Sequence, residues 1–220
     1  MEALGCSLMG YLVGSINPAY IIARMRGFDI RKKGSGNAGA SNALIVMGKK
    51  VGIISALLDI FKAYIMVKIA AVLFPSLTQA RVLAGVGCII GHIFPVFMGF
   101  RGGKGLATLG GTLLALDARV FLVMFIFEAI FALLVDYICV VPITASVIIP
   151  FVYFYQTVDL IGSLILALTA VVIVLKHVEN LKRIHNGTEA HLSFLWHRDK
   201  EIKRLSGEEP TESVSDSEHH

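Results

Sequence analysis

Glycines alternate with short polar side chains in an early stretch of the chain, residues 34–42. Its glycines are Gly34, Gly36 and Gly39, and its hydrogen-bonding side chains are Ser35, Asn37, Ser41 and Asn42. Glycines let successive backbone N–H groups turn toward one point, and the short side chains add further donors. We therefore expect residues 34–42 to bind a phosphate or another oxyanion. The alternative interpretation is a flexible connection between two helices.

A second glycine-rich stretch carries two cations. It runs through Arg101, Gly102, Gly103, Lys104 and Gly105 to Thr108. It leads directly into an apolar segment, so a helix N-terminus, backbone donors and two cations are expected to converge on an anion. A nucleotide is not indicated, because a Walker A loop needs glycine at position 98 and serine or threonine at position 105. A basic turn that only sets topology would not explain three glycines around the lysine.

The third polar cluster follows the last apolar segment. If a helix continues there, His177, Asn180 and Arg183 lie on one face, at spacing i, i+3 and i+6. A histidine, an amide and a guanidinium would then point toward one place, followed by Gly187 and Glu189. The alternative is that His177 has only a structural role.

The composition shows which elements must position these clusters. Of 220 residues, 55% are apolar and 16% are charged, and the mean hydropathy is +0.73. These values exclude an ordinary soluble domain and a disordered chain. Apolar segments long enough for membrane helices cover residues 3–23, 51–74, 82–98, 119–135, 138–157 and 159–176. With the shorter segment 106–116, we expect an all-α integral membrane protein, a compact bundle of about seven transmembrane helices.

Basic residues predict the orientation of this bundle. Sixteen of the 20 Lys and Arg residues fall in residues 24–50, 101–104 and 176–204. The positive-inside rule places all three stretches in the cytoplasm, which requires an odd number of helices, an external N-terminus and a cytoplasmic C-terminus. Because these residues flank apolar spans, nucleic-acid binding is not expected. Residues 1–205 should form one membrane-embedded domain, and residues 206–220 an acidic, disordered tail.

Other residues of chemical interest receive structural interpretations. Cys6, Cys88 and Cys139 are isolated in apolar sequence, so they predict neither a disulfide framework nor a zinc site. Asp59 and Lys62 lie three residues apart inside a span and could simply pair. Lys68 could extend its side chain to the membrane surface. His92 precedes a Phe-Pro break and is expected to serve packing.

Two anion-binding loops and a His/Asn/Arg face favour acyl transfer onto a phosphorylated alcohol. The residues that suggest this also carry a resemblance. Gly14-Ser15-Ile16, residues 34–42, residues 91–96, residues 102–108 and residues 177–189 together resemble the bacterial acyl-phosphate:glycerol-3-phosphate acyltransferase family, PlsY. The resemblance extends to about residue 190. Since no nucleophile paired with a base is legible, direct transfer is favoured over a covalent acyl-enzyme.

The resemblance implies transfer of a fatty acyl group from acyl phosphate to the 1-hydroxyl of sn-glycerol 3-phosphate. The products would be lysophosphatidic acid and phosphate, and no metal or organic cofactor is expected. The expected catalytic residues are Ser35, Lys104, His177 and Asn180. Substrate-binding residues are expected to be Gly34, Gly36, Asn37, Gly39, Asn42, Gly102, Gly103, Gly105, Thr108, Cys139, Arg183, Gly187 and Glu189.

The resemblance also implies a place in the cell. The enzyme is expected to be a monomer in the lipid of the bacterial plasma membrane, with its active site facing the cytoplasm. The loop of Gly102, Gly103 and Lys104 would bind the phosphate of glycerol 3-phosphate. His177 or a substrate phosphate oxygen would take the hydroxyl proton.

Two positions depart from the family pattern. Ile45 stands where relatives commonly have arginine, and Cys139 replaces a serine hydroxyl with a weaker thiol donor. The departures leave a weakened or silent paralogue as an alternative. A small anion transporter is the other alternative, although the chain shows no internal repeat of the kind common in transporters.

Overall fold

The computed structural model describes residues 1–195 of the chain. The C-terminal limit expected at residue 205 and the tail expected at residues 206–220 lie outside the described residues. Within residues 1–195 the regular elements are all helical, as expected: α1 (Glu2–Gly14), α2 (Pro18–Met25), η1 (Ile30–Lys32), α3 (Ala40–Met47), α4 (Lys49–Leu73), α5 (Ala80–Ile93), η2 (Val96–Met98), α6 (Leu106–Leu116), α7 (Ala118–Val135), α8 (Val140–Thr157), α9 (Leu160–His185) and η3 (Leu192–Leu195).

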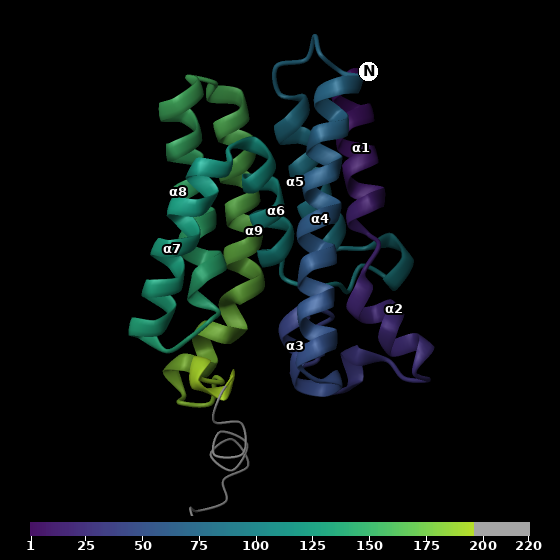
Figure 1. Cartoon of the computed structure of the whole chain (residues 1–220), viewed down its shortest axis with the longest axis vertical. Coiled ribbons are helices and arrows are strands. Elements are labelled where there is room, and N and C mark those ends of the chain that lie inside the picture. The colour runs from purple at the N-terminus through teal and green to yellow at the C-terminus, as the bar shows by residue number, and fades with distance from the viewer. Residues whose placement is uncertain (196–220) are drawn as a thin grey trace, which may run out of the picture.

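The long helices form two groups with a short helix between them (Figure 1). Helices α1, α4 and α5 pack together on one side, and α7, α8 and α9 lie on the other. Helix α6 contacts α4, α5, α7 and α8, so it bridges the groups. The glycine-rich loop at residues 101–105 leads directly into α6 and therefore lies between the two groups.

Five segments of residues 1–195 are long and apolar enough to cross a membrane: Glu2–Met25, Ala80–Met98, Ala118–Val135, Val140–Thr157 and Leu160–His185. Helix α4 has 25 residues, or about 37 Å of length, but carries Asp59, Lys62 and Lys68. The chain is thus an integral membrane protein. Seven crossings and an external N-terminus remain predictions.

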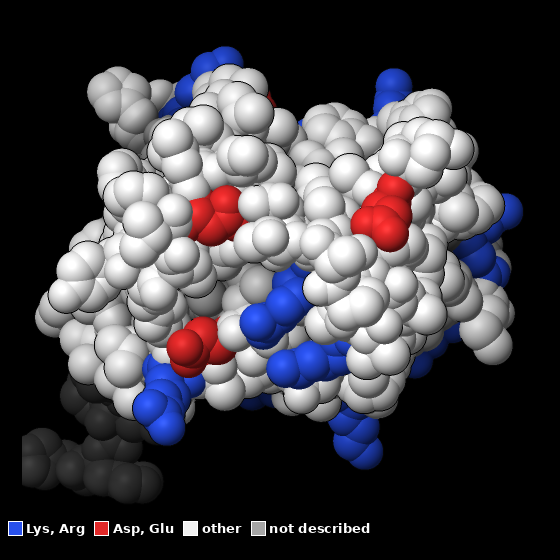
Figure 2. Space-filling model, turned by 90° about the horizontal axis from the view of Figure 1, so that it is seen from above, with Lys and Arg blue, Asp and Glu red and all other residues white. Residues whose placement is uncertain are grey.

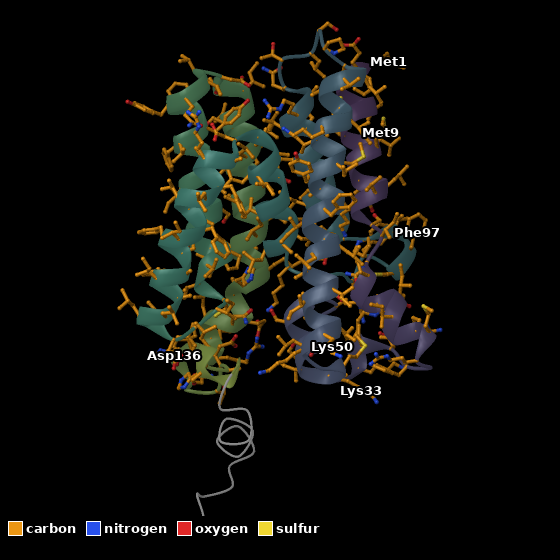
Figure 3. All side chains as sticks on the ribbon, viewed as in Figure 1. Met1, Met9, Lys33, Lys50, Phe97 and Asp136 are labelled. Atoms are coloured by element: carbon orange, nitrogen blue, oxygen red, sulfur yellow. The ribbon has the colours of Figure 1, made fainter. Side chains whose placement is uncertain are left out.

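The first basic loop and the N-terminus lie at opposite ends of the bundle, as the predicted orientation requires. Lys33, Lys50 and Asp136 lie at one end of the molecule, and Met1 lies at the other (Figure 3). The first basic loop and the turn between α7 and α8 therefore share a side. Which side faces the cytoplasm is a prediction from the basic residues.

The expected single span at residues 3–23 is broken into α1 and α2. The side chain of Asn17 accepts a hydrogen bond of 2.8 Å from the N–H of Tyr20, and Pro18 occupies the first helical position. Both features start a new helix, because an asparagine cap satisfies a free N–H and proline has none to satisfy. Asn17 also donates to the Ala38 carbonyl over 2.8 Å, which ties this break to the first polar loop.

Glycines bring α1 and α5 into close contact. A Cβ atom on Gly14 would lie 2.2 Å from the Cys88 carbonyl oxygen, and one on Gly91 would lie 2.1 Å from the Tyr11 carbonyl oxygen. Small residues at such spacing allow membrane helices to approach backbone to backbone. This contact fixes the C-terminal end of α5, from which the second glycine-rich loop departs.

Helix α6 spans residues 106–116, as predicted. It follows Gly105, whose φ of +94° is left-handed, and it ends at Asp117, which caps α7 through the N–H groups of Arg119 and Val120. Its C-terminal Ala115 carbonyl accepts from Lys68 Nζ at 3.0 Å and from Arg81 Nη2 at 2.6 Å. Lys68 therefore caps α6, where a reach to the membrane surface was expected.

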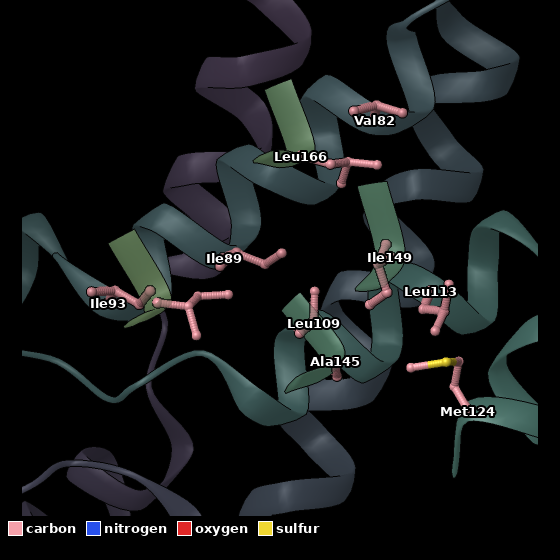
Figure 4. Packing of buried hydrophobic residues seen from close by; sticks show 10 residues of the cluster. Val82, Ile89, Ile93, Leu109, Leu113, Met124, Ala145, Ile149 and Leu166 are labelled. Carbon is pink, nitrogen blue, oxygen red and sulfur yellow. The ribbon is translucent and has the colours of Figure 1, made fainter. Parts of the chain in front are cut away.

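A hydrophobic core holds α9 against α5 and α6 (Figure 4). Its buried members are Val82, Ile89 and Ile93 of α5, Leu109 and Leu113 of α6, Met124 of α7, Ala145 and Ile149 of α8, and Leu166 and Ile173 of α9. Close van der Waals packing of such side chains stabilises helix association in a membrane, where lipid provides no hydrophobic driving force between helices. The core thus sets the distance between the polar end of α9 and the start of α6.

Candidate functional site

Four polar side chains form a connected network where the second loop meets the end of α9. Lys104 Nζ donates to Asn180 Oδ1. Asn180 Nδ2 donates to Glu189 Oε1 at 2.6 Å, and Arg183 Nε donates to Glu189 Oε2 at 2.6 Å. The network joins two cations through an amide and a carboxylate. All four residues were expected in the site, and the structure brings them together.

The network is partly withdrawn from water. Burial lowers the pKa of Lys104, and the positive charge of Arg183 lowers it further, while Glu189 opposes both effects. Glu189 is only 7% exposed. A lysine with a depressed pKa and few water contacts is suited to bind an anion strongly, because electrostatic attraction is weakly screened there.

Cys139 faces the same network from the N-terminal end of α8. Burial, the negative charge of Glu189 and a hydrogen bond with Glu189 raise the pKa of the thiol to about 12. The side chain is buried, so it stays protonated and can donate weakly to the carboxylate. The structure therefore places Cys139 against Glu189.

A turn after α9 brings Glu189 back to the helix. Gly187 has a φ of +69°, and the N–H groups of Thr188 and Glu189 donate to the Arg183 carbonyl at 2.8 and 3.1 Å. A residue with a side chain would be strained at this φ, which accounts for the glycine. Gly187 thus shapes the turn that places Glu189.

His177 lies one helical turn before Asn180, and both side chains are buried on the same face of α9. His177 Nδ1 is 2.8 Å from the Ile173 carbonyl oxygen. A carbonyl can only accept, so Nδ1 carries the hydrogen and Nε2 of the neutral ring is left to accept a proton. The predicted shared face of α9 is confirmed for His177 and Asn180.

The glycines of the second loop are explained by packing. Gly102 N–H donates to the Ile93 carbonyl at 3.1 Å, and Gly103 N–H donates to the His92 carbonyl at 3.0 Å. A Cβ atom on Gly102 would lie 2.1 Å from the His92 carbonyl oxygen, and one on Gly103 would lie 2.0 Å from His92 Nε2. These two N–H groups were expected to bind phosphate, but they are already paired with α5.

Other donors remain at the start of α6. The first N–H groups of an α-helix have no acceptor within the helix, and here they follow Lys104 directly. The Thr108 hydroxyl donates to the Gly105 carbonyl at 2.9 Å and is fully buried. Thr108 therefore supports the turn, while Lys104 and the N-terminal turn of α6 can meet an anion.

The first loop is organised around Asn42. Asn42 Oδ1 accepts from the N–H of Ser35 at 2.9 Å, and Nδ2 donates to the carbonyls of Asn37, Lys33 and Ile30 at 2.8, 3.0 and 3.2 Å. The Asn42 amide thus closes the loop on itself. Ser35 is exposed at its tip.

Glycines permit this closure. Gly34 and Gly36 have φ values of +58° and +73°, and a Cβ atom on Gly34 would lie 2.2 Å from Asn42 Oδ1. Gly39 precedes α3 and is buried beside Asn37. The alternative of a flexible connection therefore does not describe this loop, which is folded through specific bonds.

Arg31 joins the first loop to the second. Its guanidinium pairs with Asp29 at 2.7 Å and donates to the Met98 carbonyl at 2.6 Å. The contact involves the start of the second loop, several residues before Lys104. The sequence alone did not indicate a role for Arg31, because one arginine among several cations carries no signal of a bond so distant in sequence.

A polar hollow lies at the Met1 end of the bundle, away from this network (Figure 2). It has a volume of about 560 Å³, and its lining includes Arg81, Asp117 and Asp159. All three side chains serve the fold, because Arg81 caps α6, Asp117 caps α7, and Asp159 accepts from the Gly162 N–H of α9. Among residues 1–195, no three His, Cys, Asp or Glu side chains form a group that could hold a metal ion.

The fold and the network define an integral membrane protein whose polar site is suited to anionic substrates. A family model described as glycerol-3-phosphate acyltransferase matches residues 4–187. A glycerol-3-phosphate acyltransferase of Brucella anthropi is 36% identical over 196 residues, covering 87% of this chain and 94% of the relative. One of Aquifex aeolicus is 35% identical over 190 residues, covering 86% and 98%.

Solved structures agree. A crystal structure of PlsY, an integral membrane glycerol 3-phosphate acyltransferase, in its glycerol 3-phosphate form has a TM-score of 0.79 and 33% identity over 89% of this chain and 98% of that chain. The lysophosphatidic acid form gives 0.75 and 32% over 87% and 95%. This chain belongs to the glycerol-3-phosphate acyltransferase family. It is therefore a membrane acyltransferase of the PlsY type, which places it in phospholipid biosynthesis.

Proposed function

We propose that this enzyme transfers a fatty acyl group from acyl phosphate to the 1-hydroxyl of sn-glycerol 3-phosphate. The hydroxyl oxygen forms a bond to the acyl carbonyl carbon, and the bond from that carbon to the phosphate oxygen breaks. The products are lysophosphatidic acid and inorganic phosphate. Relatives crystallised in glycerol 3-phosphate and lysophosphatidic acid forms support this choice of acceptor and product.

The observation that carries the proposal is the network of Lys104, Asn180, Glu189 and Arg183. Two anionic substrates repel each other, and two partly buried cations offset that repulsion. Lys104 and the first turn of α6 bind the phosphate of glycerol 3-phosphate. In the structure Asn180 Oδ1 accepts a hydrogen bond from Lys104. When the phosphate of glycerol 3-phosphate binds Lys104, it replaces Asn180 Oδ1 as the acceptor.

The remaining expected site residues receive supporting roles in the proposal. Arg183 neutralises charge on the second phosphate, and Ser35 at the tip of the first loop contacts the acyl phosphate. The hydroxyl proton leaves to His177 Nε2 or to a phosphate oxygen of the substrate. General acid–base catalysis contributes about 10²- to 10⁴-fold, so a smaller loss in His177→Gln favours the substrate oxygen.

The proposed location follows from charge. The site lies toward the end of the bundle that carries Lys33 and Lys50, which the positive-inside rule assigns to the cytoplasm. We propose that the enzyme is a monomer in the bacterial plasma membrane and works without a cofactor.

A donor comparison tests the proposed reaction. Purified protein in detergent receives radiolabelled glycerol 3-phosphate and either palmitoyl phosphate, palmitoyl-coenzyme A or palmitoylated acyl carrier protein, and thin-layer chromatography follows lysophosphatidic acid. Product is expected with palmitoyl phosphate alone. Product from a thioester and none from palmitoyl phosphate would contradict the proposal.

A further inference from the structure

Three ionisable side chains lie buried within the helical bundle. Asp59 and Lys62 belong to α4, and His92 belongs to α5. Asp59 Oδ1 lies 2.6 Å from Lys62 Nζ and 3.3 Å from His92 Nδ1. The Asp59 and His92 side chains are 1% and 3% exposed, and that of Lys62 is 10% exposed. The expected pairing of Asp59 with Lys62 is confirmed, and His92 joins it.

Such a cluster is costly in an apolar environment. Ionisable groups inside membrane proteins are rare and commonly functional, and apolar residues of similar volume often replace buried ion pairs without loss of stability. Packing alone therefore does not account for a carboxylate and an ammonium at this position. Their contacts with backbone groups do.

Lys62 reaches the break between α1 and α2. Its ammonium donates to the carbonyls of Gly14 at 2.9 Å and Ile16 at 2.6 Å. These carbonyls lie at the end of α1, where a helix leaves acceptors unpaired. The ammonium also forms the ion pair with Asp59 at 2.6 Å and lies 3.3 Å from His92 Nδ1.

His92 reaches the second loop. Its backbone carbonyl accepts from the N–H of Gly103 at 3.0 Å. Its imidazole lies against the same residue, because a Cβ atom on Gly103 would come within 2.0 Å of Nε2. Lys104, the cation of the site, follows Gly103 directly.

We infer that Asp59, Lys62 and His92 act together as positioning residues that hold the Gly102–Gly103 backbone, and with it Lys104, at the place where the acceptor's phosphate binds. Asp59 and Lys62 fix the imidazole on its Nδ1 side. The Nε2 side of the imidazole then fixes the loop at Gly103. None of the three needs to touch the substrate. The inference rests on the proposed function only in assigning Lys104 to glycerol 3-phosphate.

The matched variants are Asp59→Asn and Glu179→Gln. Both convert the acidic member of an acid–lysine pair at i, i+3 spacing, but the pair of Glu179 with Lys182 is exposed on α9, with side chains 70% and 65% exposed. Asp59→Asn is expected to weaken glycerol 3-phosphate binding about ten-fold, the low end of the loss caused by removing a partner that orients a metal ligand. Glu179→Gln is expected to leave binding unchanged.

The decisive measurement is a double-mutant cycle with Lys104→Met. Calorimetry with glycerol 3-phosphate alone gives Kd for the wild type, the two single variants and the double variant, and thermal unfolding in detergent checks the fold. If Asp59 acts through Lys104, Asp59→Asn weakens binding by less than about two-fold once the ammonium is gone. An undiminished ten-fold effect in the Lys104→Met background would overturn the inference.

A second variant covers the case in which Asp59→Asn does not fold. His92→Asn keeps a polar group near the position of Nδ1, whereas His92→Leu removes it. We expect His92→Asn to bind glycerol 3-phosphate more tightly than His92→Leu. Equal Kd values for the two variants would overturn the inference. If the wild type makes lysophosphatidic acid but the effects of Asp59→Asn and Lys104→Met on binding free energy are additive, only the positioning role is rejected. A wild type that neither binds nor acylates glycerol 3-phosphate rejects the proposed function as well.

Discussion

Replacing Lys104 by methionine removes the ammonium group and keeps an unbranched side chain of similar length. Lys104 is partly buried and bonds to Asn180, so the variant deletes a cation without opening a large cavity. A hydrogen bond to a charged group contributes about 1.5–3 kcal/mol. This corresponds to a rise of about 10- to 150-fold in Kd. We expect most of it in the KM for glycerol 3-phosphate.

The same residue predicts a pH dependence. Burial lowers the pKa of Lys104, so its cation is present at low pH and is lost as the pH rises through the depressed pKa. An ordinary lysine loses its charge near pH 10.4, and here the loss begins at lower pH. Above pH 7 the substrate phosphate is already largely a dianion. The KM for glycerol 3-phosphate should therefore rise with alkaline pH in the wild type but not in Lys104→Met.

The assay is steady-state kinetics with each substrate varied in turn. Lys182→Met is the matched control, because Lys182 is exposed on α9 and pairs only with Glu179 among the bonds seen in the described residues. An increase confined to the KM for acyl phosphate would show that the two phosphate sites are assigned the wrong way round. No change in either KM would refute the role of Lys104 as a substrate ligand.

Further predictions concern Ile45, Cys139 and Lys32. Ile45→Arg should raise turnover or lower a substrate KM, because arginine would add a bidentate cation on α3, directly after the first loop that is proposed to contact acyl phosphate; unchanged kinetics in an active enzyme would show that the anion site has been rebuilt. The Cys139 thiol, with a pKa of about 12, should react with iodoacetamide at pH 8 far more slowly than a free cysteine, and rapid alkylation followed by mass spectrometry would contradict its burial. A cysteine introduced at the exposed Lys32 should resist impermeant thiol reagents in intact cells, since that loop is predicted to be cytoplasmic; labelling without permeabilisation would reverse the orientation.

Local signals in the sequence predicted much of the fold. Gly105 and Asp117 mark the two ends of α6, residues 106–116. A left-handed glycine and a capping aspartate each set a helix end within a few residues of their own position, so the sequence shows them directly. The polar face of α9 also follows from helical spacing alone. The break between α1 and α2 was legible in Asn17 and Pro18, but the apolar run around them predicted one span.

Tertiary contacts explain what the sequence did not reveal. Asn42 resembles a free donor in sequence, yet its amide bonds to backbone groups of its own loop. Gly103 suggested a phosphate-binding backbone, whereas its small size is required by His92 of the preceding helix. Asp59 and His92 lie 33 positions apart in the chain, and only helix packing shows that they meet.

Phosphate release without acceptor tests the central claim of direct transfer most directly. Purified enzyme is mixed rapidly with palmitoyl phosphate that carries one radiolabel in the acyl chain and another in the phosphate, in the absence and presence of glycerol 3-phosphate. Released phosphate and lysophosphatidic acid are then counted in the same samples. Direct attack by the acceptor predicts no phosphate burst without glycerol 3-phosphate and one phosphate for each lysophosphatidic acid when it is present. A burst equal to the enzyme concentration without acceptor would reveal a covalent acyl-enzyme and contradict the mechanism built on Lys104, Asn180 and Arg183.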